Sequence, residues 1–564
     1  GGPSVPMALA SALLCALTLL LPPALNAAEV DVIIFGAGAS GLQAAKSLKS
    51  KGVESFLIIE AQGVVGGRVK KCRHRGVTME LGANWVHGRK RNKLNDLVAA
   101  AGLEGVNTEF EDADMYNPKT GELMPADDFD VNWLEEDMID CMEAYSGKIW
   151  KDGLPDRSAQ EVLKDECGWE PEGEVENVLE WTTTDYDYGK PPWKVSTKHM
   201  VPDPDAVEQC TEFDWVDFFI KDPRGYVHFL DLMSGDFTEK IRLGEVVEEV
   251  TYSATGVVVK TSAGQHTAKY AVSTLSNGAL LHAARSSMFS PPLPGDKVAA
   301  LEGRPMVTYT KIFLTFPSKF WGDRQFYFYP SARRGWLPLW HNLDCEALVP
   351  GSKTLMVTMV DERSAEFIAM PEAQQKSELM EVVRAMFGAG APEFTAITFH
   401  DWANDPLFRG SWSSPSPAAP GSDPSALAIR NPVDRLFFAG EGTYPLWGGT
   451  LHAALYSGEL VAETIAACMD NDNSFICTCA RDPECDEAPY AGAYGVCPED
   501  APPPSDDAGT DAPSTPVDTA APTNAPTNAP TTAGPATAAP DTSGADVAVA
   551  AGGAIIMAVL AFLS

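Results

Sequence analysis

Three glycines near residue 40 have the spacing of a loop that binds a dinucleotide. Gly36, Gly38 and Gly41 lie between an apolar run, residues 30–35, and a helical pattern. The first glycine permits a tight turn, the second lets a pyrophosphate approach the backbone, and the third lets helix and strand pack closely. Glu60 ends the next apolar run and is placed to accept hydrogen bonds from ribose hydroxyls. This pattern predicts dinucleotide binding at the amino terminus of a helix.

A lysine interrupts a second apolar pattern, VTYTKIFLTF, at residues 307–316. Strand periodicity places Lys311 on one face with Tyr309 and Phe313. Burial of an ammonium is costly unless another group compensates for it. A desolvated lysine has a lowered pKa and can carry a proton, whereas a lysine near a strand end can simply extend to solvent.

The residues after Glu60 indicate which dinucleotide is bound. EAQGVVGGRV places Gly66, Gly67 and Arg68 six to eight residues beyond Glu60. This second glycine pair with an arginine resembles the signature of FAD-dependent oxidases more than that of NAD dehydrogenases. A glycine-rich surface turn is the alternative.

Four further blocks resemble the flavin amine oxidases of the polyamine oxidase type. They are ELGANWVHG, VVEEVTYSATGVVVKTSAG, YTKIFLTFPSKFW and LFFAGEGTYPLWGGTLHAALYSG, and they occur in the family's order between about residues 29 and 468. The resemblance implies an α/β fold of the amine oxidase and glucose–methanol–choline oxidoreductase kind. A Rossmann-like FAD-binding domain is expected from residues 29–110, 240–290 and 430–468, and an α+β substrate-binding domain from residues 111–239 and 291–429.

The same resemblance implies an activity and a set of cofactor contacts. The activity is FAD-dependent oxidation of polyamines (spermine, spermidine or their N-acetyl derivatives) by O₂, giving aldehyde and amine products and hydrogen peroxide. The implied cofactor positions are Gly36, Gly38, Ala39, Ser40, Gly41, Glu60, Ala61, Gly67, Arg68, Gly82, Ala83, Asn84, Trp85, Val247, Trp402, Gly440, Glu441, Thr450 and Leu451. Trp402 has the alternative of a plain core residue.

The resemblance assigns the catalytic role to Lys311, which matches the family lysine that holds a water beside the flavin. Tyr309 is expected to line the same cavity, and Trp412, in GSWSS, matches one of two aromatic rings that close it. Thr450 replaces the second ring, a tyrosine in the plant-type pattern, and Trp447 is a candidate to compensate. Monoamine oxidases place a flavin-bonded cysteine in this block, so its absence predicts non-covalent FAD.

Other residues are expected to bind the cationic amine. TDYDYGKPP resembles a family segment beside the substrate tunnel, which makes Asp187 a candidate for a distal ammonium and Tyr186 and Tyr188 its walls. His87 occupies a position that is glutamate in some members and histidine in others, and a neutral histidine can accept a hydrogen bond from an amine. A solvated loop aspartate and a structural histidine are the respective alternatives.

Other substrates and roles remain open. An L-amino-acid oxidase needs an arginine for the substrate carboxylate, and no motif places one beside the flavin. A monoamine oxidase needs the missing cysteine, and a histone demethylase is disfavoured by the export signals. A catalytically weak cell-surface flavoprotein is the alternative from another class.

The two ends of the chain predict export to the cell surface. Residues 1–28 contain MALASALLCALTLLL and then small residues, as in a signal peptide; a soluble helix is the alternative. Residues 501–545 form a Pro/Thr/Ala stalk that cannot bury a core. The apolar tail at 546–564 resembles a glycolipid-anchor signal, with a retained membrane span as the alternative.

Charge and cysteine content narrow the partners. The net charge of −36 disfavours nucleic acid and favours cationic ligands, unless it serves only solubility. Five of the eleven cysteines (Cys468, Cys477, Cys479, Cys485 and Cys497) lie in or beside residues 469–500. In an exported protein this predicts a disulfide framework. Zinc is the alternative, although this segment contains no histidine, and no metal site is predicted.

Overall fold

The computed structural model describes residues 28–90, 92–124, 131–200, 216–417, 426–445 and 447–470, with the side chains of 131–137 excepted. The predicted leader, cysteine-rich segment, stalk and anchor signal lie almost entirely outside these residues. Their predictions therefore stay predictions.

The first apolar run forms a buried central strand, β1 (Glu29–Phe35), of an eight-stranded sheet. The sheet order is β13-β10-β11-β12-β1-β2-β9, and β19 pairs with the carboxyl-terminal half of β12. The other strands are β2 (Phe56–Glu60), β9 (Ile241–Leu243), β10 (Val247–Ser253), β11 (Gly256–Thr261), β12 (Gly264–Ser273), β13 (Phe289–Ser290) and β19 (Leu436–Phe438). Strands β9, β2, β1, β12 and β19 are parallel, as a Rossmann-like domain requires.

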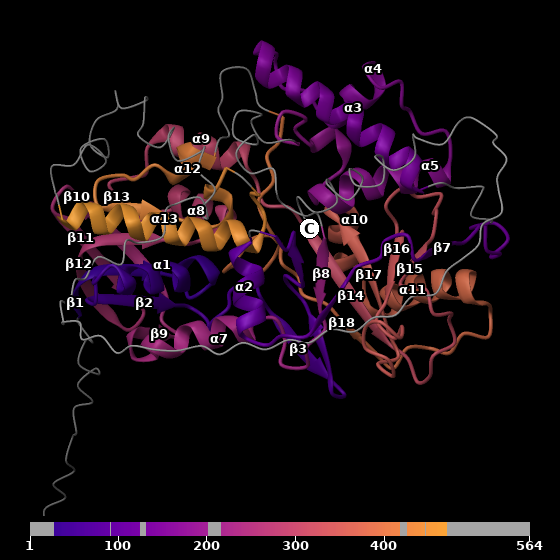
Figure 1. The fold of residues 1–564 in the computed structure, drawn as a ribbon, viewed down its shortest axis with the longest axis horizontal. Coiled ribbons are helices and arrows are strands. Elements are labelled where there is room, and N and C mark those ends of the chain that lie inside the picture. The colour runs from indigo at the N-terminus through magenta and orange to yellow at the C-terminus, as the bar shows by residue number, and fades with distance from the viewer. Residues whose placement is uncertain are drawn as a thin grey trace, which may run out of the picture.

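Helices cover both faces of this sheet (Figure 1). One face packs against α1 (Ala39–Ser50), α2 (Lys93–Ala100), α7 (His228–Ser234) and α13 (Leu451–Asp470). The other packs against α8 (Asn277–Arg285), α9 (Gly295–Gly303) and α12 (Ala426–Arg430). The expected domain boundaries at 240, 290 and 430 therefore differ slightly from the packing, because α7, α9 and part of α12 belong to this core.

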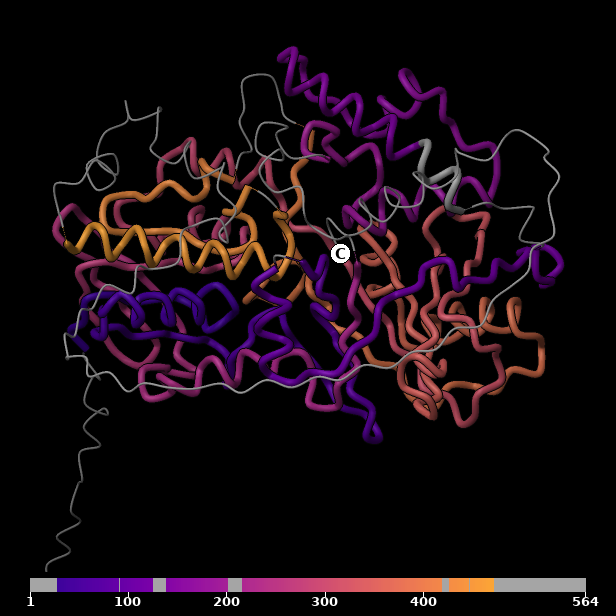
Figure 2. Tube along the Cα trace, viewed as in Figure 1, coloured from indigo at the N-terminus to yellow at the C-terminus, as the bar shows by residue number. Residues whose placement is uncertain are grey.

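Helices α1 and α13 lie side by side although they are the first and last described helices (Figure 2). Gly458 makes this approach possible, because a Cβ built there would lie 2.2 Å from the carbonyl oxygen of Ser40. The predicted assembly of this domain from discontinuous segments is thus visible in one helix pair.

A six-stranded sheet forms the second half, in the order β18-β14-β17-β16-β15-β7. Its strands are β7 (Ala113–Met115), β14 (Tyr309–Thr315), β15 (Phe326–Phe328), β16 (Leu339–Asn342), β17 (Thr354–Val360) and β18 (Ala396–Thr398). The even residues Ile312 and Leu314 of β14 join a core with α10 (Asp361–Ala369) and α11 (Glu372–Phe387). On the opposite face, the odd-numbered residue Phe313 packs in a separate hydrophobic cluster that contains Trp85, and Lys311 lies over the Trp85 ring. The predicted alternation of this strand is confirmed.

A three-stranded sheet joins the two halves. It consists of β5 (Trp85–His87), β8 (Asp217–Ile220) and β6 (Gly105–Asn107). Val86 and Ile220 pack in the core of α1 and α13, whereas Trp85 and Phe219 pack with Phe313 of β14. Because side chains alternate across a strand, this small sheet fixes the position of β14 relative to the nucleotide-binding half. A hairpin of β3 (Lys71–His74) and β4 (Val77–Glu80) precedes it.

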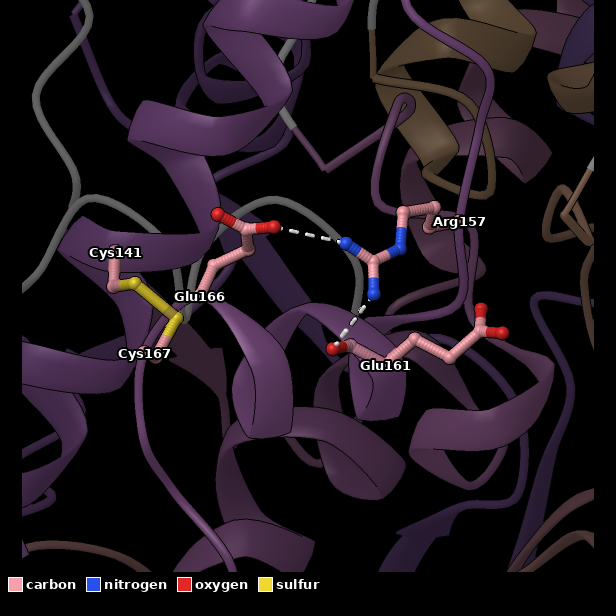
Figure 3. Close-up of a disulfide and its surroundings, with 5 residues drawn as sticks. All are labelled: Cys141, Arg157, Glu161, Glu166 and Cys167. Atoms are coloured by element: carbon pink, nitrogen blue, oxygen red, sulfur yellow. Dashed lines mark hydrogen bonds and ion pairs between the residues drawn. A yellow bond between two sulfur atoms is a disulfide. The ribbon is translucent and has the colours of Figure 1, made fainter.

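A helical layer covers one end of the second sheet, where Figure 1 shows α3 (Val131–Asp152), α4 (Ala159–Asp165) and α5 (Glu174–Trp181) together. The Cys141–Cys167 disulfide ties α3 to the segment after α4, with 5.9 Å between the two Cα atoms. Nearby, Arg157 donates to Glu166 and to the carbonyl of Glu161 (Figure 3). Short helical turns complete the fold: a π-helix at Thr182–Tyr186 and 3-10 turns at Pro192–Lys194, Gly235–Lys240 and Glu441–Thr443. Within the described part of the chain, no helix is both long and apolar enough to span a bilayer.

Candidate active site

A cavity of about 560 Å³ extends from the glycine loop to β14. Every predicted cofactor residue lines it except Gly41. Gly41 instead allows α1 to pack against the loop, because a Cβ there would lie 2.0 Å from the carbonyl oxygen of Gly36. This is the packing role that the motif gives its third glycine. The cavity also contains Lys311, His87, Tyr309 and Trp412.

The glycine loop leaves its backbone open to the cavity. Gly36 has φ +106°, a region that favours glycine, while a Cβ on Gly38 would meet only the Cα of Gly67, at 4.0 Å. Glu60 braces the loop, since its Oε2 accepts from the amide of Ala37 at 2.7 Å. Burial raises the pKa of the Glu60 carboxyl. Its predicted hydrogen bond to a ribose remains a prediction.

Arg68 is held at the cavity wall by an ion pair. Its Nη1 donates to Glu441 Oε1 at 2.7 Å and to the carbonyl of Ser411 at 3.0 Å. The other oxygen of Glu441 accepts from the Ser413 hydroxyl at 2.6 Å and from the Gly449 amide at 3.1 Å. Glu441 therefore binds three segments that are far apart in sequence and fixes the guanidinium beside the cavity.

A further cation, Arg409, was missed in the sequence. It lines the cavity, and its buried Nε has no hydrogen-bond partner among the described residues. An orphaned donor of this kind, with the open backbone of Gly38 and the amino terminus of α1, matches the needs of a pyrophosphate. The residues present therefore fit FAD. Arg409 directly precedes the GSWSS block, which was the available signal.

Lys311 is buried at the cavity wall on β14. Its Nζ donates to Asn84 Oδ1 at 2.5 Å and to the carbonyl of Gly82, and it lies 5.7 Å from the centre of the Trp85 ring. Burial lowers the pKa of Lys311 to about 7, although the charge of Glu80 opposes this. An amine with such a pKa gains and loses a proton near neutral pH, which is what a proton carrier needs.

Aromatic rings line the cavity beside Lys311. The rings of Tyr309 and Trp412 lie 4.7 Å apart and tilted. Thr450 reaches the cavity, but its hydroxyl accepts from the amide of Ala453 at 3.2 Å and thereby caps α13. Trp447 does not line this cavity. It packs on His452 and lines a second space of about 40 Å³, so the compensation proposed for it is not seen here.

The TDYDYGKPP residues lie behind the cavity wall. Tyr186, at the end of the π-helix, packs 5.9 Å from the ring of Tyr309, and Asp187 is fully buried. Tyr188 lines the second, smaller space. These three residues do not line the large cavity, and their roles in substrate binding remain predictions. The π-helix is a frequent feature of functional sites.

His87 lines the cavity with an unforeseen partner. Its Nδ1 lies 2.8 Å from Asp217 Oδ1, and both side chains are buried. Strand pairing places the two residues directly opposite each other on β5 and β8. They are 130 residues apart in sequence, so no local pattern could have connected them.

Proteins of known family are similar to this chain over most of its described length. The family model for flavin-containing amine oxidoreductases matches residues 39–161 and 204–466. The chain belongs to this family. It is 33% identical over 451 residues to polyamine oxidase 7 of Oryza sativa subsp. japonica, covering 76% of this chain and 93% of that protein. It is 32% identical over 493 residues to polyamine oxidase 1 of Zea mays, covering 83% and 96%.

A solved structure of a putrescine oxidase with redesigned cofactor binding has the same fold. The TM-score is 0.63 at 19% identity, covering 78% of this chain and all of that chain. The amine oxidoreductase fold predicted from the sequence is confirmed, as are its cofactor and reaction class.

The protein is therefore an FAD-dependent amine oxidase of the polyamine oxidase type. FAD held by the glycine loop, Glu60 and Arg68 would supply the redox chemistry of amine oxidation, with O₂ as the electron acceptor. The chain must orient that carbon, exclude bulk water and manage protons. Tyr309 and Trp412 provide apolar walls, while Lys311, whose pKa burial lowers to about 7, is a cavity group able to exchange protons.

Proposed function

We propose that the amines oxidised by this protein are polyamines such as spermine, spermidine or their N-acetyl derivatives. The observation that carries the proposal is the cavity itself, which is lined by the Tyr309–Trp412 aromatic pair, by Lys311 and by His87. Aromatic rings suit the methylene chains of such a substrate and also attract its ammonium groups. The two curated polyamine oxidases, similar over almost their whole length, support this substrate class.

The charge of the chain supports the same proposal. A net charge of −36 raises the local concentration of multivalent cations through long-range attraction. Asp187 is fully buried next to Tyr186, whose ring packs 5.9 Å from that of Tyr309 at the cavity.

The test is a panel of substrates on the purified protein. Hydrogen peroxide release and the flavin spectrum are followed with spermine, spermidine, their N-acetyl forms, monoamines and L-amino acids. We expect turnover with at least one polyamine and little with monoamines or L-amino acids. A flavin that stays oxidised with every polyamine would reject the proposal and favour a surface flavoprotein with weak catalysis.

We also infer that the FAD is held without a covalent bond and that the protein is exported to the cell surface. Thr450 at the cavity cannot form the cysteinyl link. The Cys141–Cys167 disulfide supports export, because such bonds persist in oxidising compartments. Acid precipitation should release the flavin into solution, and phospholipase C should release a glycolipid-anchored protein from intact cells. Flavin in the pellet would contradict the first inference, and absence of the protein from the surface of intact cells would contradict the second; protein that is present there but resists the lipase would favour the retained span.

A further inference from the structure

The smaller space of about 40 Å³ lies behind the wall of the large cavity. Ser414, which lines it, is two residues beyond Trp412 of the large cavity. Gly448, which also lines it, directly precedes Gly449 of the large cavity. One buried water needs roughly 10–15 Å³, so this volume admits a small ion but is too small for a polyamine. None of the described residues that line it is acidic.

Arg304 brings a buried guanidinium to this space. The side chain is only 5% exposed, and its buried Nε has no hydrogen-bond partner among the described residues. Its Nη2 lies against Gly448, because a Cβ built on that glycine would be 2.2 Å away. Burial lowers the pKa of Arg304, and the carboxylate that opposes this, Glu441, is already bound to Arg68 at 2.7 Å. A guanidinium stays protonated in a protein, so Arg304 keeps a positive charge there.

Three further polar groups of the lining can donate a hydrogen. The hydroxyls of Tyr188 and Ser414 and the Nε2 of His199 are buried without a hydrogen-bond partner in the described part of the chain. Burial raises the pKa of the Tyr188 hydroxyl, which therefore keeps its proton. Burial also lowers the pKa of His199 to about 3, so the imidazole is neutral and has one N–H to donate. Together with Arg304, these groups lack a common acceptor.

Positive charge converges on this lining. The charges of Arg304, Lys198 and Lys190 all lower the pKa of His199, after the larger effect of burial. The Nζ of Lys190 is buried and donates to the carbonyl of Ser414 at 3.0 Å. A residue of the space therefore lies in the field of three cations, which favours an anion as its neighbour.

The carboxyl groups in the neighbourhood lie outside the lining. Asp187 and Glu143 act on the Tyr188 hydroxyl, where both raise its pKa after the effect of burial. Burial raises the pKa of Glu143 itself to about 7, so it is only partly ionised at neutral pH. Asp156 and Asp361 act on the buried lysine. None of these four lines the space, so none supplies the acceptor that the donors lack.

We propose that this space is a binding site for a small monovalent anion of the chloride type, held by Arg304, Ser414 and the other unpartnered donors. The anion supplies the counter-charge of a buried guanidinium, which is costly to leave unpaired, and it forms charge-assisted hydrogen bonds. Bound there, it joins the end of α9 to the segments that carry Trp412 and Gly449, and so supports the wall of the large cavity. Binding of the anion does not depend on which amine the protein oxidises.

The test is the melting temperature of the holoenzyme against chloride concentration, with sodium chloride replacing sodium gluconate at constant ionic strength. A ligand that binds only the folded protein raises its stability in proportion to the logarithm of its concentration above the dissociation constant. We expect chloride and bromide to raise the melting temperature of the wild type, since gluconate is too large for the space. An unchanged melting temperature across the replacement would overturn the inference.

Two variants locate the effect. Arg304→Met removes the charge and keeps an apolar stem, so in gluconate it should be at least as stable as the wild type. In chloride the wild type should be the more stable of the two, and the same ranking in both salts would overturn the inference. Ser414→Ala removes a hydroxyl that has no partner among the described residues, so it should fold well and bind chloride about tenfold more weakly. This second variant decides the question if Arg304→Met fails to fold.

Lys297→Met is the matched control. It also removes a buried cation, but Lys297 lines neither cavity, and the variant should keep the full response to chloride. Loss of the response in this variant would show that the salt acts on buried lysines and arginines in general, which contradicts a defined site.

Crystals of the holoenzyme in bromide place the anion directly. We expect an anomalous peak within hydrogen-bond reach of Arg304 Nε and Ser414 Oγ. A space that contains only water would overturn the inference. A bromide peak without any response to chloride in solution would mean binding at crystal concentration only, and would overturn it as well.

Discussion

Replacement of Lys311 by methionine tests the central assignment of the site. Methionine has a similar length and adapts to irregular gaps, so the change removes the amine with little change in packing. Two acceptors, the carbonyl of Gly82 and Asn84 Oδ1, lose their donor, at a cost of about 1–3 kcal/mol each.

Removal of the buried charge offsets this cost. The pKa of Lys311 lies at about 7 instead of 10.5, and at about 1.36 kcal/mol for each pKa unit the ammonium is disfavoured by about 5 kcal/mol. Because the folded pKa is lowered, this penalty is complete below pH 7 and disappears as the pH rises to 10.5. Wild-type stability should therefore increase across that window relative to Lys311→Met, and both proteins should be folded and contain flavin at neutral pH.

The assay is steady-state turnover against pH at saturating amine and O₂. We expect wild-type kcat to rise through a limb near pH 7, where Lys311 loses its proton and can accept one. Lys311→Met should lack this limb and turn over about 10²-fold more slowly, as expected for loss of a proton carrier. Unchanged turnover, or an unchanged limb, would refute the assigned role.

Lys297 provides a matched control. Burial also lowers its pKa to about 7, and its Nζ donates to the carbonyls of Ala428, Ile429 and Asn431 at 2.7–3.0 Å. It does not line the cavity. Lys297→Met should lower stability while leaving the limb near pH 7 in place, which separates the effect of any buried lysine from that of Lys311.

Three other outcomes can be measured directly. Glu441→Gln weakens the ion pair that holds Arg68 at the cavity wall, so we expect about tenfold weaker FAD retention, an effect of about 1.4 kcal/mol, measured as flavin per protein after dialysis; full retention would contradict it. Gly458→Val places side-chain atoms against the carbonyl of Ser40 and should destabilise by about 1–3 kcal/mol, seen as a lower melting temperature. Cys141→Ser opens a 26-residue loop and should cost about 3 kcal/mol in denaturant titrations without reductant, whereas an unchanged midpoint would show that the disulfide does not form.

Much of the fold was predictable because its signals are local. The glycine loop, its strand and its helix are contiguous, so Gly36, Gly38 and Gly41 predicted both their conformation and their ligand. The buried lysine was predictable too, because alternation within one strand already put Lys311 among apolar residues. The second of the two aromatic positions expected to close the cavity was harder to predict, because only the packing shows that Thr450 caps α13 and that Trp447 lies outside the large cavity.

The sequence by itself determined the nucleotide-binding unit, the family resemblance and the presence of a buried lysine, since each is carried by short motifs that can be read one at a time. Only the tertiary structure decided which side chains meet. Asp217 reaches His87 through the register of two short strands, and Glu441 reaches Arg68 across 373 residues. Bringing such distant residues together costs loop-closure entropy, which only the formation of the whole core offsets. These contacts therefore depend on how the two sheets pack, and no periodicity in the sequence indicates that packing.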